Sequence, residues 1–581
     1  MKKFIIPVLA LLALASCTAK FDEMNKPDTG LTFDVAQPMY IFGRTLYNGS
    51  SNDHQRNFNL NDDMYAHYFA QGLGWTDFWR YNAGWGDIFW RDFYTERLQE
   101  YWLIEDLCAN REDYSCIKAC NDIWNVVLWL RVIDRHGDAP YFDETGAFAA
   151  GKGTTLPYSK VADIYADLIK RLKNDVSLLG KGGDQVTFSS YDFLFQNNWN
   201  QWKKFANTLI MRLSMRMSGL GDTYKADFAA AANGCFDNPK DYARISCDTG
   251  VWGDYYDRTY NDWSNTFTNC DFVSMLSGVN RGYAIGVVDP RRAFFFKEGT
   301  RPSWEKYLQS IQDQIDKEKA EDEPNADKIK KLQEKLDALK KKGGYDGTTW
   351  DGYPFDYTAD TEEGIVDGHG GSKSFAGLNM YDVNGLFHYS GKGNENLAWC
   401  YGSYSEALFL KAEGALRGWI SGNAEDLWKQ AIKASMDEIG EFVKRSGGTK
   451  TISASDQNAY IAALPSFGSS KEDQLRSIMI QKWIALYPNS VEAWAEQRRT
   501  GYPDYASKVL TYPAVSASSG VSVGNIIQRI PYPQNEYNTN AVNIPADAKD
   551  YNAKNMEKGI FWSLKGENGV QKAAEAPVNH F

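Results

Sequence analysis

Apolar residues recur at three- and four-residue steps through most of the chain after Ala36, which predicts a mainly helical fold. Three clear runs predict buried helices at 123–133, 164–179 and 202–217, and Gly137 follows the first of them as a helix terminator. No segment of the sequence keeps a sustained alternation of apolar and polar residues. We therefore expect strands to be few and short.

A further helical run lies between Asp87 and Glu105, with Asp87 placed as the N-cap. Its spacing marks Trp90 and Trp102 as core residues. The other apolar members of the run are Ile88, Phe89, Phe93, Tyr94, Leu98 and Tyr101.

Residues 407–436 have the pattern of a helical repeat unit. A first helix contains Ala412 and Ala415, a turn follows at 418–422, and a second helix contains Ala431. These small residues let two helices approach closely, as in tetratricopeptide pairs. One pair cannot bury its own apolar face, so we expect further pairs stacked beside it.

Residues 304–342 differ from the rest of the chain. Their apolar positions recur at three- and four-residue steps on both sides of Pro324-Asn325, with charges elsewhere, which predicts an inserted helical hairpin of coiled-coil type. Its seam consists of Trp304, Leu308, Ile311, Ile315, Ile329, Leu332, Leu336 and Leu339. The hairpin is either a solvated insertion or a partner-docking arm, and its charge pattern favours the solvated insertion.

Two other regions lack helical periodicity. Residues 233–286 and 343–394 are rich in Gly, Asp, Asn, Trp and Tyr. Long irregular segments of this composition are typical of functional surface loops.

The start of the chain has the order of a secretory signal, with a charged end, an apolar run and small residues before Cys17. Leu14-Ala15-Ser16-Cys17 resembles a bacterial lipobox, in which a peptidase cuts before the cysteine and its sulfur is acylated. The apolar run is shorter than the ~20 residues that a membrane span needs. We expect a signal peptide at 1–16, a lipidated Cys17 with its tether at 17–35, and a single domain at 36–581.

The acidic balance restricts the partners of this domain. The formal net charge of −12 argues against nucleic acid or anionic lipid as the main ligand, because both select basic surfaces. Eight cysteines less the lipidated one leave an odd number, without metal-ligand spacing. We expect most of them to be small buried residues, and the sequence leaves their disulfide state open.

Eight segments in order resemble the SusD/RagB family of nutrient-binding outer-membrane lipoproteins of Bacteroidota, across nearly the whole mature chain. One departure is His136, where the family has an aromatic residue, and the hairpin at 304–342 is another. The segments are Ser16-Cys17 with 21–25, 135–141, 202–216, 289–291, 404–419, 481–485, 492–503 and 529–538.

This resemblance implies a fold of tetratricopeptide-like helix pairs supporting an irregular, loop-rich lobe that carries the ligand site. It implies lipid anchoring in the outer membrane, facing the cell surface. It also implies a partner, a TonB-dependent transporter of the SusC type, over which the lipoprotein sits as a lid.

The polar residues of these segments stand beside apolar helix faces, where a buried charge must be paired. We therefore predict that they join helix pairs rather than bind ligand. They are Asn207, Arg212, Glu406, Glu413, Arg498 and Arg499.

Aromatic residues make 14% of the chain, and two stretches combine them with glycine and polar residues. Oligosaccharides present flat C–H faces ringed by hydroxyls, so a site for them needs aromatic platforms beside hydrogen-bonding side chains. Glycines at 72–86 break the helical period and leave its rings available to a surface. The family places ligand contacts in comparable loops. The predicted ligand residues are Trp75, Asp77, Trp79, Arg80, Tyr81, Trp85, Trp252, Tyr255, Tyr256 and Trp263.

Catalysis has little support in the sequence. The six histidines show no His-Glu-x-x-His spacing, and there is no Gly-x-Ser-x-Gly elbow. Asp-rich loops at 254–262 and 356–367 offer oxygen ligands for Ca²⁺ without EF-hand spacing, and no other cofactor is expected. We predict an oligosaccharide-binding protein that is not an enzyme, with peptide capture of the RagB kind and a cell-surface glycan hydrolase as the alternatives.

Overall fold

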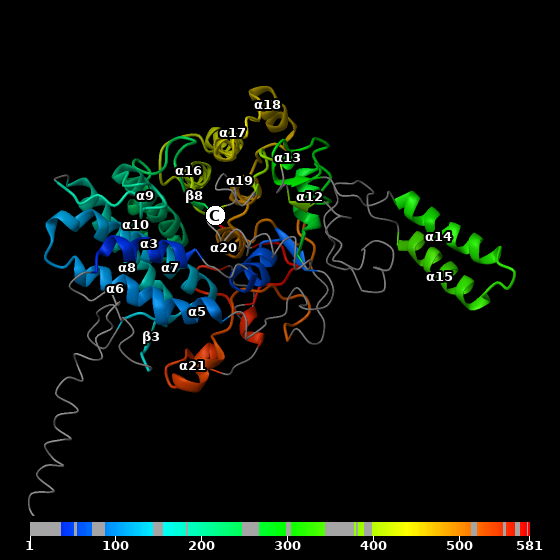
Figure 1. Cartoon of the computed structure of the whole chain (residues 1–581). Coiled ribbons are helices and arrows are strands. Elements are labelled where there is room, and N and C mark those ends of the chain that lie inside the picture. The colour runs from blue at the N-terminus through cyan, green and yellow to red at the C-terminus, as the bar shows by residue number, and fades with distance from the viewer. Residues whose placement is uncertain are drawn as a thin grey trace, which may run out of the picture.

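The computed structural model describes residues 36–50, 55–71, 87–142, 155–181, 184–246, 266–297, 304–342, 377–378, 382–388, 398–512, 520–549, 553–563, 570–577 and 579–581. Helices dominate these residues, as predicted (Figure 1). The α-helices are α3 (Pro38–Gly49), α5 (Ile88–Asp92), α6 (Leu98–Leu107), α7 (Ser115–His136), α8 (Val161–Gly180), α9 (Trp199–Arg216), α10 (Asp222–Ala231), α12 (Cys270–Leu276), α13 (Arg292–Phe295), α14 (Trp304–Lys319), α15 (Ala326–Lys342), α16 (Tyr404–Leu416), α17 (Ala424–Val443), α18 (Ala454–Ala463), α19 (Lys471–Leu486), α20 (Ser490–Thr500) and α21 (Gln534–Thr539).

Shorter helical segments lie between them. Two are π-helical, η1 (Gln55–Asp63) and η2 (Phe93–Arg97). The 3₁₀ segments are η3 (Glu112–Tyr114), η4 (Ser218–Leu220), η7 (Lys444–Ser446), η8 (Ala546–Ala548) and η9 (Ala553–Glu557).

Strands in the described part of the chain form four antiparallel pairs. Each is too short to develop a long alternation of apolar and polar residues, which confirms the expectation of few and short strands. The pairs are β1 (Phe69–Gln71) with β5 (Thr266–Thr268), β2 (Ala139–Pro140) with β3 (Tyr158–Ser159), β4 (Tyr242–Ser246) with β8 (Ala398–Ser403), and β6 (Phe296–Lys297) with β7 (Gly377–Leu378).

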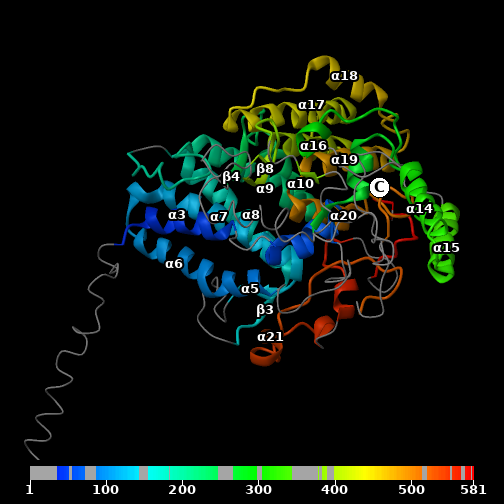
Figure 2. The same cartoon turned by 45° about the vertical axis from the view of Figure 1, so that its right-hand side comes forward.

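Helix α7 lies at the centre of the first half of the fold (Figure 2). Trp124, Trp129 and Ile133 are buried along it, and α8 and α3 pack beside it. Gly137 ends the helix with φ of 90°, a conformation that favours glycine. The predicted helices at 123–133, 164–179 and 202–217 are thus confirmed as parts of α7, α8 and α9.

Helices α16 and α17 form the predicted repeat pair and pack extensively on each other. Ala412 and Ala431 are fully buried between them, which permits the close approach that small residues allow. Helices α19 and α20 stack next to this pair, as a repeat that cannot bury its own apolar face requires (Figure 1).

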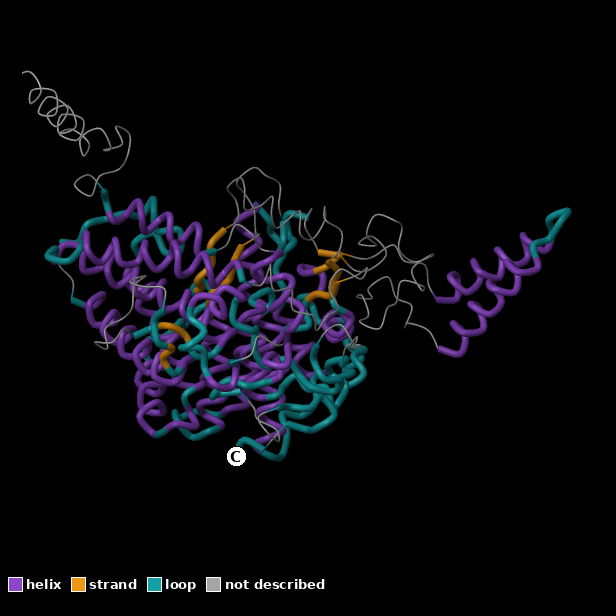
Figure 3. Tube along the Cα trace, turned by 90° about the horizontal axis from the view of Figure 1, so that it is seen from below, coloured by secondary structure: helices purple, strands orange, loops and turns teal. Residues whose placement is uncertain are grey.

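Hairpin α14–α15 extends away from the body in Figures 1 and 3. Ile311, Ile315, Leu336 and Leu339 are buried in one apolar cluster, and most charged side chains of the hairpin are exposed. Ala70 and Phe267 of the β1–β5 sheet belong to the same cluster. The hairpin is therefore confirmed, with an apolar seam that reaches the first sheet.

Asp87 stands at the N-cap position of α5, as predicted, but its side chain does not cap the helix, and its Oδ2 accepts from the backbone N–H of Gln534. Two other local expectations are wrong. Trp102 is only partly buried, whereas Trp90 is 4% exposed. The region 233–286 is not irregular throughout, because it contains β4, β5 and the buried helix α12.

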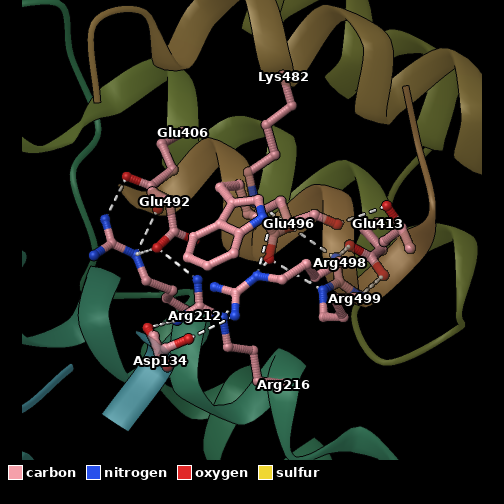
Figure 4. Close-up of polar contacts among 12 residues, drawn as sticks. Asp134, Arg212, Arg216, Glu406, Glu413, Lys482, Glu492, Glu496, Arg498 and Arg499 are labelled. Atoms are coloured by element: carbon pink, nitrogen blue, oxygen red, sulfur yellow. Dashed lines mark hydrogen bonds and ion pairs between the residues drawn. The ribbon is translucent and has the colours of Figure 1, made fainter. Parts of the chain in front are cut away.

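A buried ionic network joins the helices of the two halves (Figure 4). Arg212 of α9 pairs with Glu406 of α16 through contacts of 2.7 Å. Arg216 pairs with Asp134 of α7 at 2.7 Å and with Glu492 of α20 at 2.6 Å. Such pairs stabilise a fold only when both charges are present and well placed.

The remaining motif residues are also structural. Arg498 donates to the carbonyl oxygens of Asp134 and Gln528, and Asn207 donates to those of Lys203 and Gly234. The contacts agree with the prediction that these polar residues join structural elements.

The described cysteines are free thiols, and Cys108, Cys116, Cys120 and Cys235 are buried as expected. Burial raises the pKa of the Cys116 thiol to about 11, so it stays protonated at neutral pH.

Candidate functional site

A groove of about 480 Å³ opens between the segment from α5 to α6 and helix α21. It draws on parts of the chain that are far apart in sequence. Its lining residues are Asp87, Trp90, Arg91, Tyr94, Thr95, Gln99, Pro140, Leu156, Pro533, Asn535, Glu536, Thr539 and Asn540.

The base of this groove is aromatic. Trp90 packs against Tyr94 with ring centroids 5.0 Å apart, and it meets Tyr532 edge-on at 5.7 Å. The Tyr158 ring lies nearly parallel to Trp90 at 6.4 Å. This packing fixes the Trp90 ring in place.

His136 completes the ring cluster from the C-terminal end of α7. Its ring meets Trp90 at 5.0 Å and stacks on Tyr532 at 6.1 Å. Burial, with Arg135 beside it, lowers the pKa of His136 to about 3, so the imidazole is neutral. Its Nδ1 lies 3.0 Å from the carbonyl oxygen of Pro531, an acceptor, so Nδ1 carries the proton. His136 therefore fills an aromatic position as a neutral ring.

Three hydrogen bonds hold α21 against the opposite wall. The hydroxyl of Tyr158 donates to Glu536 at 2.7 Å, and Asn540 donates to the carbonyl oxygen of Leu156 at 3.0 Å. Asp87 accepts from the N–H of Gln534 at 3.3 Å. Burial and the Glu536 carboxylate raise the pKa of Tyr158 far above its usual range, which keeps it a donor.

The rim of the groove is exposed and polar. Arg91, Thr95 and Gln99 project from one side, and Asn535 and Thr539 from the other. Amide and hydroxyl groups of this kind both donate and accept hydrogen bonds, as sugar hydroxyls require. An apolar base with a polar rim is the usual chemistry of a small-molecule site.

All ten predicted ligand residues lie outside the described residues, as does Cys17. The aromatic stretch 72–86 runs directly into Asp87 on the groove wall. Within the described residues, no group of His, Cys, Asp and Glu is arranged to hold a metal ion, and the Asp-rich loops 254–262 and 356–367 fall outside them.

Sequence reasoning missed the half of the groove that α21 supplies. The segment 529–538 carried a family signal, including Glu536, but no local pattern indicates that it faces residues 87–99 across the fold. The structure also reveals that Trp90, predicted as a plain core residue, contributes to the base of the groove.

Comparison with known proteins fixes the family. The profile of the SusD-like family, described as Susd and RagB outer membrane lipoprotein, matches residues 25–339 and 362–563. The chain belongs to the SusD/RagB family. No curated protein matches it significantly.

Solved structures of SusD-like proteins share the fold. A chitin-binding protein aligns with a TM-score of 0.68 and 22% identity over 91% of this chain and 100% of its own. A chitin-binding SusD homologue from Flavobacterium johnsoniae aligns with a TM-score of 0.63 and 22% identity, over 90% of this chain and 98% of its own. A SusD-like protein from Bacteroides thetaiotaomicron aligns with a TM-score of 0.61 and 19% identity, over 92% of this chain and 100% of its own.

Proposed function

We propose that this SusD/RagB protein is a cell-surface lipoprotein that captures an oligosaccharide and delivers it to a TonB-dependent transporter of the SusC type. The family match across most of the chain carries this proposal. Two of the similar structures are described as chitin-binding, which supports a glycan ligand.

The groove supports a neutral sugar as its ligand. Its charged lining residues are one cation, Arg91, and two carboxylates, Asp87 and Glu536, of which Glu536 already accepts from Tyr158. The other rim groups are uncharged amides and hydroxyls. A strongly acidic or basic ligand would need more opposite charge than these residues provide.

The aromatic stretches 72–86 and 252–263 remain the proposed sugar platforms. The first of them directly precedes Asp87, which lines the groove, so the platform and the groove are neighbours in sequence. A ligand that used both would be an extended oligosaccharide and not a monosaccharide.

Membrane attachment is proposed through acylated Cys17. Among the described residues, no helix combines the length and the hydrophobicity needed to cross a bilayer. The family is one of outer-membrane lipoproteins, and multiple acyl chains would provide a stable anchor.

An array of glycans and peptides, probed with the mature protein, tests the proposal. Chitin oligosaccharides and other neutral glycans belong on it, together with acidic glycans. We expect retention by one class of neutral glycan and unchanged glycan chains after long incubation. Retention by peptides alone would favour the RagB alternative, and chain shortening would show a hydrolase.

A second experiment tests delivery. The acylated protein, purified from its native outer membrane in mild detergent, should retain a large TonB-dependent transporter as a partner. Purification of the lipoprotein alone, from membranes that contain the transporter, would contradict the delivery half of the proposal.

A further inference from the structure

Exposed aromatic rings gather at one place on the described surface. Tyr40, Tyr191 and Phe193 are 45%, 36% and 44% exposed, and among the residues whose side chains the structure describes Phe581 is the one other exposed aromatic residue. The rings of Tyr40 and Tyr191 meet at 4.9 Å, and Phe193 follows two residues later in the same turn. We name Tyr40, Tyr191 and Phe193 the α3 aromatic patch.

The turn that carries two of these rings is held rigidly. Asp192, which lies between them, is fully buried. Its carboxylate accepts from the backbone N–H groups of Leu194, Phe195 and Asn197 and from the Trp202 indole at 2.8 Å. Burying the middle residue in this way displays its two neighbours to solvent.

The turn is also locked against helix α3. A Cβ atom at Gly43 would lie 3.2 Å from the Cβ of Tyr191, so the glycine makes room for the turn. The backbone that carries Tyr191 and Phe193 is therefore held in one place beside α3. Exposed apolar surface of this kind on a rigid support usually marks an interaction site.

The patch lies where the N-terminal tether meets the body. Tyr40 is in the first turn of α3, the first described helix, and α3 begins at the end of the molecule opposite the hairpin (Figure 2). A fully extended chain from Cys17 to Ala36 spans at most about 65 Å, so α3 is the described helix nearest in sequence to the acylated cysteine and stays within that distance of the bilayer.

We propose that the α3 aromatic patch rests on the headgroup region of the membrane that holds Cys17. This inference relies on the lipid anchor of the proposed function. Tyrosine suits that region because its ring is apolar and its hydroxyl is polar. Anchoring raises the local concentration of the lipid surface, so a contact that is weak in free solution becomes occupied.

The contact is apolar in character. With a net charge of −12 the chain gains nothing from an anionic surface, so zwitterionic lipid is the appropriate probe. The orientation that results points the α3 end towards the bilayer and the hairpin end away from it.

Hydroxyl-radical footprinting with mass spectrometry tests the contact. The acylated protein is reconstituted in phosphatidylcholine vesicles without any transporter, floated with them, and compared with the Cys17→Ala protein mixed with the same vesicles. Phe581 is the matched internal control, since its 45% exposure equals that of Tyr40.

We expect oxidation of Tyr40, Tyr191 and Phe193 to fall roughly three-fold or more in the floated protein, because a headgroup contact removes water from the rings. Oxidation of Phe581 should not change. In the acylated double variant Tyr191→Ser and Phe193→Ser, protection of Tyr40 should be lost while the protein still floats.

The inference is overturned if the three rings of the floated protein are oxidised as fast as those of the Cys17→Ala protein. The lipid anchor would be unaffected by that result. Protection that appears only after transporter is added would overturn it too, since a protein surface would then cover the patch. Failure of the wild type to float would remove the anchor itself and, with it, both claims.

Discussion

Arg499 and Glu413 form a buried, two-contact ion pair that joins α20 to α16, with nitrogen to oxygen distances of 2.8 and 2.6 Å. Arg417 adds a further contact of 2.8 Å to the same carboxylate. Burial alone would raise the pKa of Glu413. The positive charges of Arg499 and Arg417 instead lower this pKa to about 2. The pair is thus part of the framework that carries the groove and not part of the site.

Glu413→Gln should destabilise the protein by roughly 3–5 kcal/mol at neutral pH, because it removes the buried negative charge that pairs with both Arg499 and Arg417 and leaves Arg499 with Glu496 as its remaining ion-pair partner. Urea unfolding measures the loss. The matched control is Glu425→Gln, which breaks an exposed pair with Lys429 on α17 and should cost less than about 0.5 kcal/mol. Equal effects of the two variants would contradict the assigned role.

The pKa of Glu438, a buried residue of α17, is shifted in the opposite direction from that of Glu413. Its carboxylate accepts from the N–H and hydroxyl of Ser405, both at 2.7 Å, yet burial raises its pKa to about 7. A folded-state pKa above the ordinary 4.5 means that this group stabilises the fold fully below about pH 4.5, and that the contribution is lost as the pH rises through about 7.

Glu438→Gln should therefore match the wild type at pH 4.5 and exceed its free energy of unfolding by up to roughly 3 kcal/mol at pH 8.5. The comparison uses denaturant unfolding at both pH values. Glu441→Gln, on the same helix but partly exposed, is the control and should show no such pH-dependent gain. A variant that is less stable than wild type at pH 8.5 would refute the assignment.

The hairpin should be dispensable for binding. Deletion of residues 305–341, with a short glycine-serine bridge, is expected to shift the melting temperature by less than about 4 °C, because most of the seam is buried between α14 and α15. Affinity for the glycan should not change. A larger fall in melting temperature would show that the contact of the hairpin with Ala70 and Phe267 stabilises the rest of the domain. Loss of transporter binding with no other change would favour the interpretation of the hairpin as a docking arm.

Exposed groove residues should affect affinity without affecting stability. Gln99→Ala and Asn535→Ala each remove a rim hydrogen-bonding group and should weaken glycan binding roughly three- to ten-fold. Gln309→Ala on the hairpin and Asn233→Ala after α10 are exposed controls of the same residue types. Unchanged binding in both groove variants would exclude the groove from the site.

Periodicity predicted the long helices well because α7, α8 and α9 each bury a continuous apolar face. It missed the π-helical segment at 93–97, whose extra residue per turn leaves the apolar spacing nearly helical. It also missed β4 and α12, since β4 pairs with a strand more than a hundred residues later and α12 has only seven residues. Long-range pairing and short length leave little local signal.

The groove was predictable only in part for the same reason. The sequence pattern identified Trp90 and Tyr94 as apolar positions of a helix. Such a pattern does not show whether the apolar face of the helix packs against the core or lines a groove that solvent can enter. Asn535 and Thr539 reach the groove only through contacts such as that of Tyr158 with Glu536, which join segments far apart in sequence.

Calorimetric titration of the best glycan from the array into the mature protein and its tryptophan variants tests the central claim most directly. Trp75→Ala, Trp79→Ala and Trp263→Ala should each lose roughly 1–2 kcal/mol of binding free energy, about ten-fold in affinity, with little change in melting temperature. Trp90→Ala, at the base of the groove and 4% exposed, should instead lose roughly 3–5 kcal/mol of stability. The account is contradicted if the three loop variants bind as tightly as the wild type while melting at lower temperature, or if the folded wild-type protein shows no heat of binding with any glycan.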